Sequence, residues 1–241
     1  MRLSQFLVFA GICSRHSASK LIAARLVTID GVIAEHPCFV SGQEKIIADG
    51  TLAILPDQCS YVLYNKPVGV DCNCNADNPQ SIVNQLVLPP AVSIRLFPVG
   101  RIDKDSHGLM LLTNDGDLCY RLLSPDYSHP KTYRVTVEPH YKKPDIDADF
   151  QQRMTQGIDL DGTLTLPCEL TIFETNQFTI TLTQGLNRQI RRMSRAVGYK
   201  VIDLQRIHIM NLALGDLPLN QSRELTTEEL ATLKKHISTP S

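Results

Sequence analysis

The feature of the sequence that most constrains the fold is a polar, glycine-bounded segment, 100–108, that runs directly into the apolar stretch 108–113. An apolar run of this length, bounded by turn residues, is typical of a buried strand. Polar side chains at the start of such a strand stand on a rigid support, where binding and catalytic groups are commonly placed. The sequence therefore predicts a buried strand with a functional loop in front of it.

Several chemistries fit the polar residues of that loop. A calcium loop built on Asp103 and Asp105 fails, because Asn114 stands where the bidentate glutamate should be. A nucleophile pair at Ser106 and His107 lacks the strained G-x-S-x-G turn that exposes such a serine. A divalent-metal pair at the two aspartates, without an identified third ligand, remains open, as does an ordinary solvated loop with two turn aspartates.

The charge of the chain is segregated along the sequence. The 241 residues contain 24 Lys and Arg against 25 Asp and Glu, a balance that excludes a disordered acidic or basic chain. Residues 2–25 nevertheless carry four basic side chains and no acidic one, and residues 185–208 carry six against one. Residues 144–162 are acidic. Two basic patches in a neutral protein are expected of a chain that meets a polyanion on one side.

The apolar run at 6–13 is too short for a membrane span of about 18–20 residues, and we interpret it as a core helix. Seven cysteines, an odd number, argue against a disulfide framework in a chain of this size and favour reduced thiols in the cytoplasm. Cys59, Cys72 and Cys74 lack a fourth ligand at zinc-finger spacing, so no metal site is predicted there.

The first fifty residues predict a small helix–helix–hairpin unit. Apolar residues recur at helical spacing from Leu3 to Ala10 before Gly11, and Ser17 is expected to cap a second helix that runs to Arg25. An Asp-Gly pair between two short apolar runs predicts a hairpin over 27–33. Residues 48–58 are interpreted as the exit and linker. We therefore divide the chain into residues 1–58 and 59–241.

The larger part predicts strands and helices in mixed order. Strands are expected at 61–64, 108–113, 132–137, 170–173, 178–182 and from 199 through 209. Helices are expected at 82–87, 116–123, 145–154 and 188–197, and a capping box of Thr226 and Glu229 begins one more near the end of the chain. Mainly antiparallel strands with helices on their faces make this an α+β protein.

The predicted helix at 188–197 is rich in arginine. Arg188, Arg191, Arg192 and Arg195 share one face, opposite an apolar one. Asn187 is expected to cap the helix and leave its first N–H groups free for phosphate. A face with four arginines and no lysine indicates recognition of carboxylate or phosphate groups rather than a merely soluble surface.

Several motifs together resemble the RsuA-type pseudouridine synthases. They are Gly100-Arg101-Ile102-Asp103 with Ser106-x-Gly108-Leu109, Leu112 to Gly116, Lys131-Thr132-Tyr133-Arg134-Val135, the run from Gln184 to Met193, and Lys66-Pro67-x-Gly69. Residues 1–50 resemble the S4 RNA-binding domain that commonly precedes this family. Within the family, the arginine helix and residues 206–211 are most similar to the large-subunit rRNA branch. Ser106 departs from the usual Thr, and Arg25 departs from the usual Gly of S4 domains.

The resemblance implies site-specific isomerisation of uridine to pseudouridine in ribosomal RNA, with 23S rRNA of the large subunit as the expected substrate. It implies no cofactor and no metal. The resemblance implies that Asp103 is the catalytic carboxylate, and whether it attacks a ribose carbon or removes the 2′ proton stays open. Tyr133 offers a face for the extruded uracil, and Arg191, by motif position, is expected to pair with Asp103. Substrates in 16S rRNA or tRNA, and a non-catalytic assembly factor, remain alternatives.

The remaining site expectations concern RNA contacts. The residues expected to contact RNA are Arg101, Lys66, Arg188 and Arg192 around the loop and Arg2, Arg15 and Lys20 on the N-terminal helices. Arg101 is expected to occupy the space that the flipped base vacates. The partner is therefore RNA rather than a membrane, and a monomer is the default for an enzyme that docks onto a large RNA.

Overall fold

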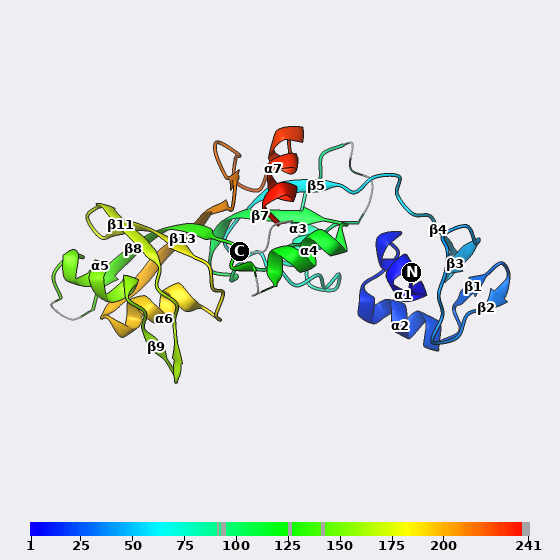
Figure 1. Cartoon of the computed structure of the whole chain (residues 1–241), viewed down its shortest axis with the longest axis horizontal. Coiled ribbons are helices and arrows are strands. Elements are labelled where there is room, and N and C mark those ends of the chain that lie inside the picture. Colours follow the sequence, from blue (N-terminus) through cyan, green and yellow to red (C-terminus); the bar gives the residue numbers. More distant parts are fainter. Residues whose placement is uncertain (91, 93–94, 125–126, 141–142, 238–241) are drawn as a thin grey trace.

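The computed structural model describes residues 1–90, 92, 95–124, 127–140 and 143–237, apart from the side chain of Arg15. A small unit at the N-terminal end is joined by one extended segment to a larger unit built on a long sheet (Figure 1). The helices are α1 (Leu3–Phe9), α2 (Arg15–Ala23), α3 (Ile82–Gln85), α4 (Gly116–Leu123), α5 (Ala148–Thr155), α6 (Gln189–Ala196) and α7 (Thr227–Ile237).

The strands fall into three sheets. The small unit holds β1 (Val27–Ile29), β2 (Val32–Ile33), β3 (Ile46–Ala48) and β4 (Thr51–Ala53). The large sheet holds β5 (Tyr61–Lys66), β6 (Phe97–Pro98), β7 (His107–Thr113), β8 (Lys131–Pro139), β11 (Glu169–Glu174), β12 (Gln177–Leu182), β13 (Tyr199–Ile209), β14 (Leu212–Ala213) and β15 (Ser222–Glu224). A separate hairpin pairs β9 (Asp159–Leu160) with β10 (Thr163–Leu164).

The N-terminal unit is the predicted helix–helix–hairpin, extended to a four-stranded sheet of order β2-β1-β3-β4. Leu3, Phe6 and Leu7 of α1 pack with Ile22 of α2 on the inner face of this sheet. The predicted cap was wrong: Ser14 caps α2, because its backbone is extended and its hydroxyl accepts the Ser17 N–H at 3.2 Å. The predicted core helix at 6–13 ends earlier than expected, at Phe9.

The linker predicted at 48–58 is shorter in the structure. β4 lies inside it and pairs with β3, so that only residues 54–60 connect the two sheets. The N-terminal hydrophobic cluster contains no residue beyond Leu55, and the other clusters begin at Tyr61. These separate cores agree with a division of the chain near residue 58, although the boundary itself remains a prediction.

The large sheet has the order β11-β12-β8-β13-β7-β5-β15. All its neighbouring strands are antiparallel except β13 and β7, which are parallel where Gln205 pairs with His107 and Arg206 pairs with Gly108. The fold is thus α+β and mainly antiparallel, as the sequence predicts.

Helices and loops cover both faces of β5 and β7, whereas β8 and β13 keep exposed residues. α5 and α6 pack over one half of the sheet through Phe150, Met154, Ile190 and Met193. α4 and α7 cover one face of β5 and β7, and the segment around α3 contributes to the cluster on the alternate residues of the same strands. Every residue of β7 after His107 is buried, which confirms the predicted strand.

Several predicted helix boundaries shift. α5 begins at Ala148 rather than 145, with Asp147 as its cap, and α6 begins at Gln189 with Arg188 in the left-handed region at φ 49°. The capping box is confirmed: the Thr226 hydroxyl accepts the Glu229 N–H at 3.1 Å, and Glu229 accepts the Thr226 N–H at 2.8 Å. No helix in the described part of the chain is long and apolar enough to span a membrane.

Gly108 is the residue that permits β13 to approach β7. Its φ is +104°, and a Cβ atom there would lie 2.3 Å from the Arg206 carbonyl oxygen. We predict that Gly108→Ala destabilises the protein by about 3 kcal/mol or more, because backbone strain adds to a clash with an unyielding strand. Chemical denaturation measures the difference.

Gly162→Ala is the matched control for that variant. Gly162 also has a positive φ, +84°, but a Cβ there meets no atom within 4 Å. The control should therefore lose only about 1–2 kcal/mol from backbone strain. Equal losses in the two variants would show that the approach of β13 does not require a glycine at position 108.

Candidate active site

A cleft of about 860 Å³ opens beside the loop that precedes β7. Its walls come from segments that are distant in sequence: the 100–106 loop, β8, the end of β12, the turn before α6, and β13. The carboxylate of Asp103 and the ring of Tyr133 line the same cleft. The structure therefore brings together two of the three catalytic residues expected from the sequence.

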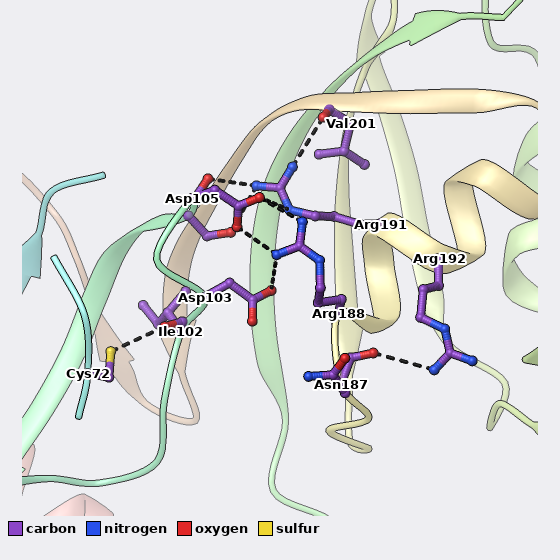
Figure 2. Close-up of polar contacts among 10 residues, drawn as sticks. Cys72, Ile102, Asp103, Asp105, Asn187, Arg188, Arg191, Arg192 and Val201 are labelled. Carbon is purple, nitrogen blue, oxygen red and sulfur yellow. Dashed lines mark hydrogen bonds and ion pairs between the residues drawn. The ribbon is translucent and has the colours of Figure 1, made fainter. Parts of the chain in front are cut away.

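Asp103 is positioned by the loop itself. The side chain of the preceding Ile102 is buried, and the Asp103 carbonyl accepts the Ser106 N–H at 3.0 Å, which turns the chain toward β7. The Asp103 carboxylate is 31% exposed, and its Oδ2 lies 3.8 Å from Nη1 of Arg188 (Figure 2). An ionisable carboxylate thus stands at the cleft surface with a guanidinium beside it.

The arginine next to Asp103 is Arg188, not the expected Arg191, whose side chain does not lie within salt-bridge distance of Asp103. The left-handed backbone at Arg188 directs its side chain back from the start of α6 to the loop (Figure 2). There it also forms a two-pronged pair with Asp105, at 3.0 and 2.7 Å. These hydrogen bonds lower the pKa of the Asp105 carboxyl group.

Arg191 instead fixes the backbone of the loop. Its Nη2 donates to the Asp105 carbonyl at 2.7 Å and to the Ser106 hydroxyl at 3.0 Å, while Nη1 donates to the Val201 carbonyl at 3.1 Å. Its Nε lies 3.5 Å from Oδ2 of Asp105. One guanidinium therefore connects α6, β13 and the catalytic loop (Figure 2).

Tyr133 lies on β8, half-buried, directly across from Arg206 of β13 and Ile180 of β12. Leu182 and Leu204 line the cleft beside it. This arrangement gives a flat aromatic surface with an apolar border, which suits a planar ring inserted from solution.

The residues expected to contact RNA differ in their exposure and in their partners. Arg101 is exposed and lines the cleft. Arg192 points away from the loop toward Asn187 (Figure 2), and it pairs with Asp161 at 2.7 Å. The expectation for Lys66 was wrong: its side chain is fully buried, and Nζ donates to the carbonyls of Pro67 and Val70. Burial lowers the pKa of this lysine, whose role is to close the turn after β5.

The cap expected of Asn187 is also wrong. Arg188 occupies the capping position without a side-chain hydrogen bond to the helix, and Asn187 lies outside it. In the N-terminal unit, Arg2 and Lys20 are exposed, whereas the side chain of Arg15 lies outside the described residues. The basic character predicted for these helices is therefore available to a ligand at Arg2 and Lys20.

Three residues at the cleft were not expected from the sequence: His129, Lys131 and Arg206. A basic residue two positions before Tyr133, on the same face of a strand, was the signal for Lys131. Burial and repulsion from Arg206 lower the pKa of Lys131 to about 8. Arg206 is 2% exposed and donates to the Leu109 carbonyl and the Met110 sulfur.

The alternatives considered for the loop receive little structural support. Ser106 is buried and accepts from Arg191, and the His107 ring lies 2.9 Å from Asp203 instead. The Cys72 thiol donates to the Ile102 carbonyl. Within the described ranges, no three His, Cys, Asp or Glu side chains gather as a metal ion would require.

Comparison with known proteins gives two matches to family profiles. Residues 60–196 match the profile described as RNA pseudouridylate synthase, and residues 1–39 match the S4 domain. The first match contains the loop, Tyr133 and the arginines of α6.

Individual relatives match along nearly the whole chain. The dual-specificity RNA pseudouridine synthase RluF of Salmonella typhi is 40% identical, over 98% of this chain and 79% of that protein. Ribosomal large subunit pseudouridine synthase B of Bacillus subtilis is 32% identical, over 97% of this chain and 95% of that protein. A crystal structure of a pseudouridylate synthase, 31% identical, superposes with a TM-score of 0.68 over 97% of this chain and 99% of that one.

The different surroundings of the neighbouring arginines predict different effects on stability. Arg191→Met removes three hydrogen bonds from a side chain that is 14% exposed, and the carbonyls of Asp105 and Val201 and the Ser106 hydroxyl lose this donor. We expect a loss of about 2–3 kcal/mol in the free energy of unfolding, measured by chemical denaturation.

Arg192→Met is the control from the same helix. It removes a pair with Asp161, which is 93% exposed, and should cost less than about 1 kcal/mol. A larger loss for Arg192→Met than for Arg191→Met would contradict the role of Arg191 in fixing the loop.

Proposed function

The chain belongs to the RNA pseudouridylate synthase family and is therefore an isomerase, and we propose that it converts specific uridines of large-subunit ribosomal RNA to pseudouridine. The observation that carries this proposal is the Asp103 carboxylate, which lies in one cleft with the aromatic ring of Tyr133 and beside an arginine. An exposed loop aspartate without an arginine or an aromatic wall would not support the chemistry.

The target uridine must leave its stack before Asp103 can reach it, because a duplex hides the glycosidic bond. The reaction breaks the bond between uracil N1 and ribose C1′, turns the base and rejoins it through C5. Asp103 acts at the ribose. Arg188, whose Nη1 lies 3.8 Å from Oδ2 of Asp103, is placed to orient that carboxylate toward the ribose.

Tyr133 and Arg191 support the same step in different ways. The ring of Tyr133 forms a wall of the cleft on which the extruded uracil stacks, and its hydroxyl is available for a proton at C5. Arg191 does not touch Asp103 and is a positioning residue, since it ties the Asp105 carbonyl and Ser106 to α6. Arg101, exposed at the cleft, fills the space left by the flipped base.

The choice of ribosomal RNA rests on the relatives. The Bacillus subtilis protein is named for the large ribosomal subunit, and it matches nearly the whole chain. The S4-like unit, residues 1–58, adds affinity through phosphate contacts of its exposed Arg2 and Lys20. Residues 59–241 form the catalytic domain.

The proposal extends to the assembly and the compartment. A monomer is the default for an enzyme that docks onto a large RNA. All seven cysteines are free thiols, which supports a reducing compartment such as the cytoplasm.

Chemical mapping of pseudouridine tests the substrate and the catalytic residue together. We predict that deleting the protein from its cells removes pseudouridine from discrete 23S rRNA positions, and that Asp103→Asn fails to restore them. The variant should retain its RNA affinity, because the amide keeps the shape of the carboxylate but not its charge. Filter binding on the same rRNA measures that affinity.

Asp216→Asn, an exposed aspartate distant from the loop in sequence, is the control and should restore all sites. Pseudouridine formed by Asp103→Asn at the wild-type rate would refute the catalytic assignment. Changes confined to 16S rRNA or tRNA would replace the proposed substrate, and no change in any RNA would favour a non-catalytic assembly factor.

The salt dependence of binding tests the N-terminal unit. Each phosphate contact contributes about 0.7–0.9 to the slope of log affinity against log salt concentration. Arg2→Gln combined with Lys20→Gln should therefore weaken rRNA binding and reduce that slope by up to about 1.4–1.8 for two contacts. Filter binding across a salt series gives the slope.

Lys45→Gln is the matched control, since Lys45 is also exposed in the N-terminal unit but precedes β3 rather than lying on a helix. It should leave the slope within error of the wild-type value. If the double variant also kept the wild-type slope, the helices would not contact phosphate.

A further inference from the structure

Lys131 and Arg206 line the cleft and bring positive charge to it, and none of the described carboxylates lies within 4 Å of their nitrogen atoms. His129 also lines the cleft, and burial lowers the pKa of its ring, which favours the neutral form. His129 is 6% exposed, and its buried Nε2 has no hydrogen-bond partner among the described residues. Buried cations without counter-ions are costly, so such a cluster indicates a site for an anionic group.

The cluster lies next to the ring on which uracil stacks in the proposed function. Lys131 and Tyr133 are two residues apart on β8, so that their side chains leave the same face of the sheet. Arg206 sits directly across from Tyr133 on β13, and side chains at such positions are neighbours on one face. A planar ring stacked on Tyr133 therefore has both cations at its edge.

We propose that Lys131 and Arg206 bind the carbonyl oxygens of the flipped uracil and stabilise the uracil anion that forms when its bond to the ribose breaks. This inference rests on the proposed function and adds two catalytic residues to it. His129 lies beside Lys131, whose Nζ donates to the His129 carbonyl at 3.1 Å and is thereby oriented in the cleft.

The charge balance of the reaction requires such a group. When the bond between N1 and C1′ breaks, its electron pair remains on the uracil, whose negative charge spreads over N1, O2 and O4. The positive charge left on the ribose is compensated at Asp103. After rotation, C5 bonds to C1′, and the proton lost from C5 is returned to the ring at N1. Cations fixed at the ring edge stabilise the state in which charge is separated.

A backbone phosphate is a poorer occupant of this position. Arg206 is 2% exposed and Lys131 is half-buried, so the site is less accessible to solvent than the exposed Arg101 at the edge of the cleft. A phosphate is bonded to two nucleotides and cannot enter it without drawing the strand in, whereas an extruded base does so by itself.

The experiment compares Lys131→Gln with the control Lys200→Gln, an exposed lysine on β13 that pairs with Glu138. We expect Lys131→Gln to lower the single-turnover rate, measured on the RNA that the wild type modifies, by about 10²-fold. Losses of this size follow when a hydrogen-bond donor to the transition state is removed. The RNA affinity of Lys131→Gln and the salt slope of binding should stay unchanged. Lys200→Gln should match the wild type in all three.

Two outcomes of this comparison would overturn the proposal. One is a wild-type rate in Lys131→Gln. The other is a loss of affinity with a slope reduced by about 0.7–0.9, which would assign Lys131 to a phosphate. If the wild type itself made no pseudouridine in rRNA, the proposed substrate would fail instead, and the variants would be compared on whichever RNA the wild type modifies.

The pH profile of activity is an independent test, because it compares the wild type with Lys131→Arg and stays valid even if Lys131→Gln fails to fold. The groups around Lys131 that titrate or carry charge are Arg206 on β13, His129 on its own segment and, beyond that histidine, His236 of α7, while β12 contributes only Leu182 and Thr181. Burial and Arg206 hold the pKa of Lys131 at about 8, so it loses its proton as the pH rises through that value.

Wild-type kcat/KM should therefore fall above about pH 8, and Lys131→Arg, which stays charged, should remain active to higher pH. Melting temperatures of the wild type, Lys131→Gln and Lys131→Arg show whether unfolding causes a loss of activity. A Lys131→Arg profile that falls at the same pH as the wild type would overturn the role of the Lys131 charge.

Discussion

Two guanidinium groups from the start of α6 determine the shape of the loop that carries Asp103. Arg188 binds the Asp105 carboxylate with both of its terminal nitrogens, and Arg191 donates to the Asp105 carbonyl and to the Ser106 hydroxyl. Without these contacts the 100–106 loop would be an ordinary polar connection between β6 and β7. With them, an aspartate has a fixed position above a cleft whose opposite wall belongs to β8 and β13. Preorganisation of this kind lets a small loop act catalytically.

The charges of the cleft are separated in space. Asp103 lines the cleft beside Arg188, whereas Lys131 and Arg206 line it from β8 and β13 and have no described acid within 4 Å. In the proposed reaction the ribose meets the carboxylate of Asp103, and the base meets the two cations. This arrangement matches the charges that develop when the bond between uracil and ribose breaks, negative on the uracil and positive on the ribose. The fold achieves it because Gly108 allows β13, with Arg206, to lie directly against the strand that follows the loop.

Local patterns in the sequence predicted most of the elements but not the side-chain partners. The buried strand before Asn114, the hairpins and the capping box of α7 depend on residues close in sequence, and they are present. Helical spacing placed four arginines on one face but could not decide which of them reaches the loop. The left-handed backbone of Arg188, held by its tertiary pair with Asp105, decided that and displaced the cap expected of Asn187. Lys66 was misassigned because nothing local reveals that every residue of β5 is buried.

The short connection between the two units limits the distance between the RNA segments that they can contact at the same time. Residues 54–60 span at most about 25 Å when fully extended, at 3.3–3.6 Å per residue. In the proposed function, the phosphates bound at α2 and the nucleotide that enters the cleft must therefore belong to neighbouring parts of one folded RNA element. A uridine in the right sequence but without that element at the right spacing would occupy the cleft with no help from the N-terminal helices. The length of the linker thus makes the choice of uridine depend on its distance from the phosphates at the N-terminal helices as well as on the local RNA sequence.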